Sequence, residues 1–408
     1  MKITTYTGIA KFLIVVPFII IYFLKFYLKY FNKKNIILYH HGWGVGHVVH
    51  DMHYFIRYLS DDNVVVLFLN DGKHNKKLSL IFKHISLNFI DIYITVPILN
   101  KKIFLNKEYS VFIYKLFKKI LFFKSTKWVN TYEDMRGIIS KKHGFKDKDD
   151  KLARFIESNF FTNMTKPSLK HNEYNFGIDR QILKYFNFEI NKYKEKILCF
   201  YLRDKGNDKR YPEEYYRSSG KIENYFKTFK YLIDSDFKIL IYGDYDYSKI
   251  LSNGFQKDII CAESLQVSKD IFCIYAALNC NYFLAAVGGG TYFPFLRKEY
   301  PKTLILDGFP FGYVIPNATL VYKSVKDKDN NYISSETLLS NSDLTYEIKK
   351  GWKIISNNED LILNSTIEFL DYHKNKHNYK EDFINLPMDL NFINCNARIS
   401  PIWLKFNP

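Results

Sequence analysis

From residue 35 onward the chain alternates short apolar runs with polar or glycine-rich turns. The apolar run Asn35 to Tyr39 is typical of a buried strand, and a glycine-rich turn follows it. The turn leads into a predicted helix, because apolar residues recur there at helical spacing, at Val48, Met52, Phe55, Ile56 and Leu59. Apolar runs at 63–69 and 88–97 predict two more strands. This order of elements is typical of a doubly wound α/β domain.

The same alternation starts again at Lys196. The predicted elements are, in order, strand 197–202, helix 221–233, strand 237–244, helix 268–279, a strand, glycine turn and helix in NYFLAAVGGGTYFPFLRKEY, and strand 303–308. The segment 346–370 ends in a further predicted helix. We therefore expect two doubly wound units in series. The expected parts are an N-terminal segment, two domains, and a helix and tail that pack back on the N-terminal domain, with bounds 1–32, 33–194, 195–345 and 346–408.

The N-terminal segment holds an uncharged apolar run from Phe12 to Leu24, bounded by Lys11 and Lys25. The run is shorter than the roughly 20 residues that cross a bilayer, but flanking lysines that reach the headgroups would let residues 8–30 span it. A helix lying in the headgroup layer and a buried first helix of the fold are the alternatives. No small-residue cleavage site follows the run, which argues against a cleaved signal peptide. We expect residues 8–30 to anchor the chain at the cytoplasmic face of the plasma membrane.

A second segment with membrane character lies within the first domain. In residues 107–128 one helical face carries apolar and aromatic side chains, and lysines crowd the remainder. A basic, aromatic amphipathic helix is typical of a membrane-surface element. A helix packed on the sheet with a solvated lysine face explains the pattern equally well.

Composition narrows the classes of protein. The 408 residues are 47% hydrophobic, which excludes a chain that is mainly disordered, and 18 Gly and 11 Pro exclude collagen-like or low-complexity character. The net charge of +17 favours a phosphate-bearing partner, namely nucleic acid, anionic lipid or a nucleotide. The five cysteines include no C-x-x-C pair, so we expect reduced thiols rather than a zinc site or a disulfide framework.

The glycine turn of the first unit carries a candidate general base. His47 follows Gly46 at the mouth of this turn, where a side chain faces a ligand bound at the helix N-terminus. Asp51, one helical turn later, is the second candidate for the base. The G-x-G-x-x-G pattern of a dinucleotide site is not met, and the neighbouring histidines form no H-E-x-x-H metal motif. A capping or packing role for His47 is the alternative.

Polar groups suited to phosphate follow the predicted strands of the second unit. Arg203 and Lys205 follow strand 197–202, and an arginine there suits bidentate contact with phosphate oxygens. Backbone N–H groups at Gly289, Gly290 and Thr291 can cradle a diphosphate. A surface Arg–Asp pair and a simple tight turn are the structural alternatives for these two motifs.

The strand 237–244 ends in Gly243 and Asp244, which we expect to contact the nucleotide at the same edge of the sheet. Asp244 also begins a D-x-D triplet, a pattern that holds a metal ion on some nucleotide diphosphates. The arginine and the glycine turn already offer charge compensation without a metal. We therefore expect no metal and no cofactor.

In their order and spacing these motifs resemble a family of bacterial glycosyltransferases encoded among surface-polysaccharide genes. The resemblance covers most of the chain after residue 35 and rests on Val45-Gly46-His47, Leu202-Arg203-Asp204, Arg217-x-Ser219-x-x-Ile222-Glu223-Asn224-Tyr225, Tyr242-Gly243-Asp244, the glycine turn before Thr291, Tyr322-Lys323 and Ile399-Ser400-Pro401-Ile402-Trp403-Leu404. The arginine strand is also similar to that of fucosyltransferases that use GDP-fucose, although Tyr201 stands where that family has histidine. The turn with Gly44, Gly46 and His47 is similar to the acceptor-side loop of the lipid-linked peptidoglycan N-acetylglucosaminyltransferase.

The resemblance implies a GT-B fold, in which two Rossmann-like doubly wound domains face a cleft. It implies an N-terminal acceptor domain and a C-terminal domain that binds the nucleotide-sugar. The expected function is transfer of a sugar from this donor to a lipid-linked surface glycan at the anionic membrane surface. The alternatives are another transferase of similar fold, such as a polysaccharide pyruvyl transferase, and a non-enzymatic basic protein that binds membrane or nucleic acid. The spread of basic residues along the chain argues against nucleic acid.

Overall fold

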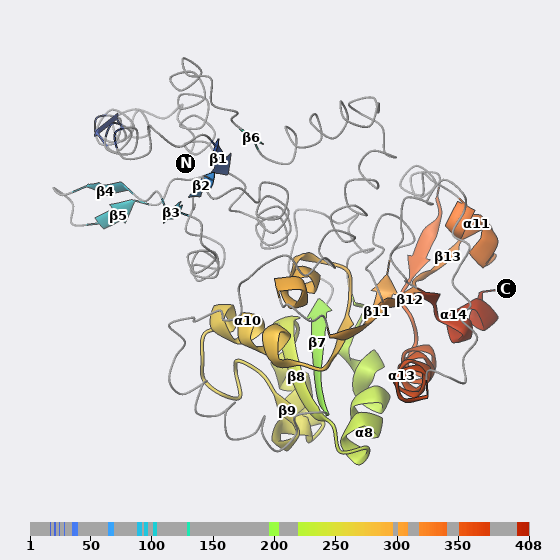
Figure 1. Ribbon diagram of the computed structural model, residues 1–408. Helices are drawn as coiled ribbons and strands as arrows, with labels where there is room; N and C mark the ends of the chain where they lie inside the picture. The colour runs from blue at the N-terminus through green and yellow to red at the C-terminus, as the bar shows by residue number, and fades with distance from the viewer. Residues whose placement is uncertain are drawn as a thin grey trace. The chain divides into compact units, whose positions relative to one another are not determined.

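The computed structural model describes part of the chain (Figure 1). Backbone and side chains are described for residues 17, 20, 21, 24, 28, 196–203, 219–269, 271–294, 301–308, 318–338, 351–375 and 398–407. Backbone alone is described for six strands between residues 35 and 130 and for helical positions 270, 295, 296, 339 and 340. The chain divides into two compact units, Met1–Asp149 with Leu169–Gly177 and Asp150–Ser168 with Ile178–Pro408. The domain bounds expected from the sequence remain predictions.

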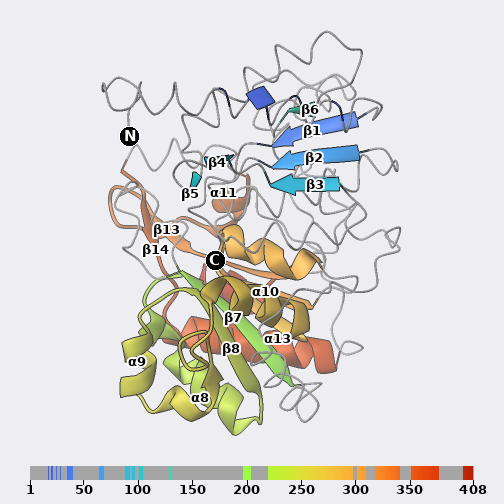
Figure 2. The ribbon, with the colours of Figure 1, turned by 90° about the vertical axis from the view of Figure 1, so that its left-hand side faces the viewer.

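The first unit contains a parallel sheet of four strands in the order β3-β2-β1-β6 (Figure 2). Its strands are β1 (Asn35–Tyr39), β2 (Val64–Phe68), β3 (Asn88–Asp91) and β6 (Val129–Asn130). The first strand lies inside the sheet, with β2 on one side and β6 on the other. Strands follow β1 on both of its sides, which agrees with the strand order expected of a doubly wound unit.

The prediction of a single strand over 88–97 is wrong, because the structure has two separate strands there. Its first half is β3, whereas its second half is β4 (Ile94–Val96), which pairs antiparallel with β5 (Lys101–Ile103) in a separate two-stranded sheet. Pro97 directly follows β4 and has no N–H to donate to a ladder, so the strand ends there. Apolar content alone does not mark the break, because both halves are rich in strand-forming residues.

The second unit is built on a seven-stranded parallel sheet in the order β15-β12-β11-β10-β7-β8-β9. The strands are β7 (Ile197–Arg203), β8 (Lys238–Asp244), β9 (Ile259–Ile260), β10 (Tyr282–Ala285), β11 (Lys302–Gly308), β12 (Ala318–Tyr322) and β15 (Arg398–Ile399). The chain runs outward from β7 to β9 and then crosses back to β10 on the other side of β7. The carboxyl ends of β7 and β10 therefore lie at the point where the strand order reverses.

Helices cover both faces of this sheet (Figure 1). One face carries η3 (Ile222–Tyr225), α8 (Phe226–Asp234) and α13 (Glu359–Lys374), and the other carries α10 (Lys269–Asn279) and η5 (Gly289–Leu296). Neighbouring residues of β7 point to opposite faces, so Phe200 packs on Phe229 of α8 while Tyr201 packs on Tyr242. We call these the α8 face and the η5 face.

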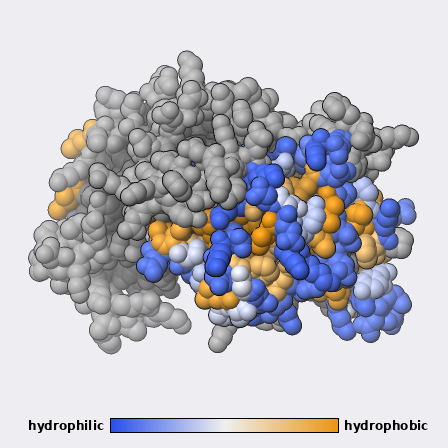
Figure 3. Space-filling view, turned by 90° about the horizontal axis from the view of Figure 1, so that it is seen from below, coloured by the Kyte–Doolittle hydropathy of each residue, from blue (hydrophilic) through white to orange (hydrophobic). Residues whose placement is uncertain are grey.

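The strands of this sheet are apolar because both of their faces are covered. Six of the seven residues of β7 are buried, as are all five of β12. Helix α8 turns Phe229 and Leu232 inward. Asn358 caps the N-terminus of α13, where its side chain accepts a hydrogen bond from the Leu361 N–H at 2.9 Å. The described surface seen in Figure 3 mixes hydrophilic residues with smaller apolar areas.

Smaller elements complete the second unit. They are α9 (Tyr247–Ser252), η4 (Phe255–Lys257), β13 (Ser324–Lys326), α11 (Ser335–Ser340), β14 (Lys353–Ile355) and α14 (Pro401–Phe406). In the described part of the tail, β15 extends the seven-stranded sheet beside β12, and α13 packs on α8, η3, β11 and α14. The described part of the tail therefore belongs to the second unit. Its expected packing on the N-terminal domain remains a prediction.

Little of the N-terminal segment is described. Pro17, Ile20, Ile21, Leu24 and Leu28 are helical, and the last four of these side chains are exposed. Among the described residues, no helix is long and apolar enough to cross a membrane. The anchor at residues 8–30 remains a prediction, and the predicted helix at 107–128 lies outside the described residues.

Candidate functional site

Arg203 is the last residue of β7 and lies half-buried at the carboxyl edge of the sheet. Its strand neighbours are β8 and β10, and its partner in the register is Asp244 of β8. Parallel sheets of this kind bind ligands in the crevice outside the carboxyl ends of the strands, at the point of reversal. The structure therefore places Arg203 at the position where an anionic ligand meets a sheet of this topology.

Ser219 makes hydrogen bonds with both backbone polar groups of Arg203. The Arg203 N–H donates to Ser219 Oγ at 2.6 Å, and the Ser219 N–H donates to the Arg203 carbonyl at 2.7 Å. Ser219 is buried, so these hydrogen bonds are shielded from water. They close the segment between the two residues, which carries the predicted phosphate ligand Lys205 and lies outside the described residues.

The glycine turn after β10 lies directly against the ring of Tyr201. A Cβ atom added at Gly290 would lie 2.3 Å from Tyr201 Cε2, and one added at Gly288 would lie 2.6 Å from the Tyr201 hydroxyl. Contacts this short do not occur in folded proteins, so both positions require glycine as long as Tyr201 is present. The first reason for these two glycines is thus close packing on a buried tyrosine.

Thr291 is buried and makes two hydrogen bonds that close this turn. Its hydroxyl donates to the Ala286 carbonyl at 2.7 Å, and its N–H donates to the Gly288 carbonyl at 3.1 Å. Its predicted role as a phosphate donor therefore competes with hydrogen bonds that it already makes. The expected contribution of Gly289 is compatible with its place in the first turn of η5, where backbone N–H groups lack partners within the helix. The N–H of Gly290, which was also expected to contribute, interacts with Tyr201 instead.

Two tyrosines fix the glycine turn from beneath. Tyr242 donates its hydroxyl to the Gly290 carbonyl at 2.6 Å, and the Gly290 N–H faces the Tyr201 oxygen. Burial raises the pKa of Tyr201, while the nearby positive charge of Arg203 lowers it and the negative charge of Asp244 raises it. Arg203, Asp244 and the glycine turn therefore surround one buried phenol on the η5 face.

Gly243 and Asp244 end β8 beside Arg203. The φ angle of Gly243 is 122°, and a Cβ atom there would lie 1.9 Å from the Leu202 carbonyl oxygen. Only glycine therefore fits between the ends of β7 and β8. Asp244 is exposed at the edge, where a carboxylate can accept hydrogen bonds from hydroxyl groups of a ligand.

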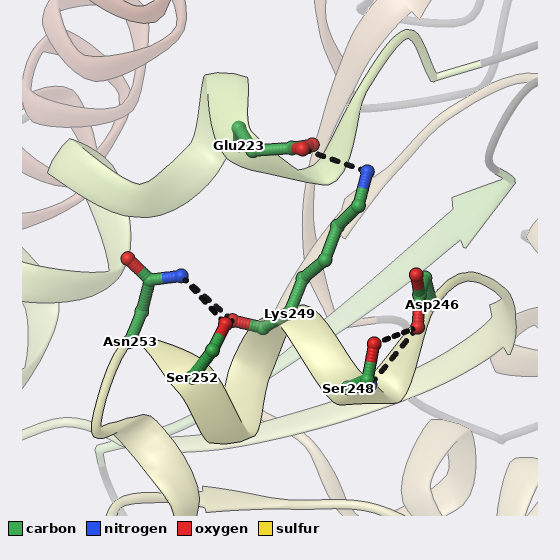
Figure 4. A network of polar contacts seen from close by, with 6 residues as sticks. All are labelled: Glu223, Asp246, Ser248, Lys249, Ser252 and Asn253. Atoms are coloured by element: carbon green, nitrogen blue, oxygen red, sulfur yellow. Dashed lines mark hydrogen bonds and ion pairs between the residues drawn. The ribbon is translucent and has the colours of Figure 1, made fainter.

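The second carboxylate of the D-x-D triplet has a structural role, which Figure 4 shows. Asp246 caps α9, where its side chain accepts from the Ser248 N–H at 3.0 Å and from the Ser248 hydroxyl at 2.6 Å. Lys249 of the same helix pairs with Glu223 at 2.7 Å. Within the described residues no group of three or more acidic, His or Cys side chains is placed to hold a metal ion, and the four described cysteines are free thiols.

On the α8 face the structure brings together polar residues that sequence reasoning did not select. Tyr225 donates its hydroxyl to Asp307 Oδ2 at 3.0 Å, and the Ser219 side chain lies beside the same phenol. Lys323 lies close to Asp307, and both side chains are fully buried. Ser219, Tyr225 and Lys323 belong to motifs quoted above for the family resemblance, and these motifs could have identified them as candidate site residues. Asp307 stands in an apolar run and gave no such signal.

Four of the predicted site residues in the first unit, His47, Asp51, Gly44 and Gly46, lie outside the described residues. Their roles as general base and acceptor loop remain predictions. Of the predicted residues in the second unit, the structure gathers Arg203, Asp244, Gly243 and the glycine turn at one edge of the sheet.

The chain is similar to two solved structures at low identity. One is a glycosyl transferase family 9 protein from Veillonella parvula, with 11% identity and a TM-score of 0.42 over 71% of this chain and 86% of that one. The other is the E. coli heptosyltransferase WaaC with ADP-2-deoxy-2-fluoro heptose, with 12% identity and a TM-score of 0.37 over 78% of this chain and 99% of that one. Similarities this low assign neither a family nor an activity to the chain. No protein-family model and no curated protein matches it.

Proposed function

We propose that the protein is a glycosyltransferase whose second unit binds the diphosphate of a nucleotide-sugar donor. One observation carries the proposal: Arg203 and the turn Gly288 to Gly290 follow the two adjacent strands at which the parallel sheet reverses its order. This edge combines a guanidinium group with the first turn of a helix, and both favour phosphate oxygens. The resemblance in sequence motifs to surface-polysaccharide glycosyltransferases agrees with this chemistry.

In this proposal Arg203 stabilises the charge that develops on the leaving diphosphate. Lys205 and the N–H group of Gly289 add to the same field, as a metal ion does in other transferases. Gly243 lets the nucleotide approach the backbone closely, and Asp244 accepts hydrogen bonds from its hydroxyl groups. His47, or in second place Asp51, takes the proton of the acceptor hydroxyl in an inverting reaction.

The proposed acceptor is a lipid-linked surface glycan at the cytoplasmic face of the plasma membrane. The exposed side chains of Ile20, Ile21, Leu24 and Leu28 support a membrane contact, because helical residues with this spacing present apolar surface to one side. The net charge of +17 supports attraction to anionic headgroups. Flotation of the full-length protein with vesicles of phosphatidylglycerol tests this part, and absence of binding at low salt would contradict it.

The donor site is tested by calorimetric titration with UDP-, GDP-, CMP- and dTDP-sugars. We expect one base class to bind, and Arg203→Ala to weaken that binding at least about tenfold, since a charge-assisted hydrogen bond contributes about 1.5–3 kcal/mol. Arg203→Lys keeps the charge but loses the bidentate geometry, so an intermediate affinity is expected. Lys230→Ala, on the exposed side of α8, is the control. Unchanged binding by Arg203→Ala would refute the proposed phosphate site.

A further inference from the structure

We propose that Asp307 is a positioning residue for Arg203 and acts on it through Tyr225 and Ser219. This inference rests on the proposed function, because it assigns Arg203 to the donor phosphates. Asp307 lies near the end of β11, and Arg203 ends β7, with β10 between these strands in the sheet. The two residues are therefore too far apart for direct contact, and the connection runs through hydrogen bonds over the end of β10.

The first link joins Asp307 to the start of α8. The Tyr225 hydroxyl donates to Asp307 Oδ2 at 3.0 Å, and the Asn357 N–H donates to Asp307 Oδ1 at 2.9 Å. Asn224, beside Tyr225, donates its side-chain amide to the Asn357 carbonyl at 3.0 Å. Both carboxylate oxygens are thus engaged, and the segment before α8 is tied to the segment before α13.

The second link joins Tyr225 to Arg203. The Ser219 hydroxyl lies beside the Tyr225 phenol, and the Ser219 oxygen accepts from the Arg203 N–H at 2.6 Å. The Ser219 N–H completes the clamp by donating to the Arg203 carbonyl at 2.7 Å. Ser219 therefore lies between the backbone of Arg203 and the phenol that Asp307 holds, so its position depends on Tyr225 and hence on Asp307.

The backbone of Asp307 shows how strongly this arrangement is held. Its φ angle is +54°, in the left-handed region that side chains with a Cβ rarely adopt. Such a conformation costs about 1–3 kcal/mol and persists only where the surroundings determine it. Here two donors and the buried ammonium of Lys323 hold the carboxylate in place.

The buried ammonium group of Lys323 stabilises the negative charge of Asp307. Burial raises the pKa of Asp307, and the positive charge of Lys323 lowers it again. Burial also lowers the pKa of Lys323 to about 8, while Asp307 raises it. Each charge thus favours the ionised form of the other, and a carboxylate accepts the Tyr225 hydrogen bond more strongly than a neutral acid does.

The test uses inorganic pyrophosphate as the probe of the anion site, in calorimetric titrations of the full chain. We expect Tyr225→Phe, which removes only the bridging oxygen, to weaken binding about fivefold. We expect Asp307→Asn to weaken it less, because asparagine tolerates the left-handed backbone and still accepts from Tyr225. Tyr231→Phe, a half-buried tyrosine of α8 outside the chain of contacts, is the matched control and should bind like the wild type.

Two further measurements separate positioning from general loss of structure. Ser219→Thr keeps the hydroxyl and should restore affinity relative to Ser219→Ala. In an Arg203→Ala background, Tyr225→Phe should cause no additional loss, because its effect passes through Arg203. Affinities of Tyr225→Phe and Asp307→Asn equal to that of the wild type, together with loss in Arg203→Ala, would overturn this inference alone. Full pyrophosphate affinity in Arg203→Ala would instead overturn the proposed function.

Discussion

The two faces of the seven-stranded sheet hold the candidate site by different means. On the η5 face, Tyr201, Tyr242 and the glycine turn fit together by shape, with ring centroids of the two tyrosines 5.3 Å apart. On the α8 face, aromatic packing of Phe200 on Tyr225 and Phe229 is combined with buried charges at Asp307 and Lys323. Shape fixes where a turn lies, whereas a chain of hydrogen bonds also fixes the direction in which a group points.

The difference between the two faces predicts how a substitution on each of them destabilises the protein. Overpacking on the η5 face costs strain that a smaller neighbour can relieve. Loss of one partner on the α8 face leaves a buried polar group unpaired, which costs its full desolvation. The following changes probe this contrast.

The largest effect is expected at the ion pair of Arg398 and Glu368, which joins β15 to α13 on the α8 face. Arg398 also donates to Thr319 Oγ1 at 3.0 Å and covers the ring of Tyr372, and Ser400 donates to Glu368 at 2.8 Å. Arg398→Ala leaves the Glu368 carboxylate buried and without its charged partner, so we expect about 3–5 kcal/mol of lost stability in urea unfolding. Lys227→Ala, which breaks an exposed pair with Asp360, is the control and should change little.

The glycine turn of the η5 face should respond to the size of residue 201. Gly290→Ala forces a Cβ against the ring of Tyr201 and should cost about 1–3 kcal/mol. For Gly288→Ala the shortest contact is with the Tyr201 hydroxyl. Tyr201→Phe should therefore relieve Gly288→Ala but not Gly290→Ala in a double-mutant cycle of thermal unfolding. Equal relief at both positions would show that the turn adapts.

The buried pair of the α8 face should appear in the pH dependence of stability. The pKa of Lys323 is lowered to about 8, below its value in the unfolded chain, so above this pH the native state binds fewer protons than the unfolded state. The free energy of unfolding should therefore rise with pH, by about 1–2 kcal/mol between pH 8 and 9.5. Lys323→Met should lack this increment. Parallel profiles of the two proteins in urea titrations would contradict the prediction.

The smallest effect is expected for Tyr242→Phe on the η5 face. It removes the hydrogen bond to the Gly290 carbonyl at 2.6 Å but leaves the ring packing with Phe283 and Phe293. We expect about 1 kcal/mol of lost stability in chemical unfolding. Tyr225→Phe on the α8 face should cost more, because it strips a donor from the buried Asp307. Equal costs for the two tyrosines would remove the contrast between the faces.

Much of the second unit follows from the sequence. The predicted strands 197–202, 237–244 and 303–308 agree with β7, β8 and β11 to within one residue at each end, because runs buried on both faces stand out as apolar. β15 escaped prediction, since two residues are too few for a periodic pattern. Arg203 and the glycine turn were found from their place after strands. The Asp307 network was not, because its members come from distant segments and meet only in the folded sheet.

The contact between Tyr201 and the glycine turn also limits how this sequence can diverge. A side chain at position 288 or 290 becomes acceptable only after residue 201 has become smaller, so the substitution at 201 must come first. Related chains should therefore carry either a large residue at 201 with glycines at both positions, or a small one with freedom at the turn. The size of the side chain at residue 201 thus determines the order in which these substitutions can occur.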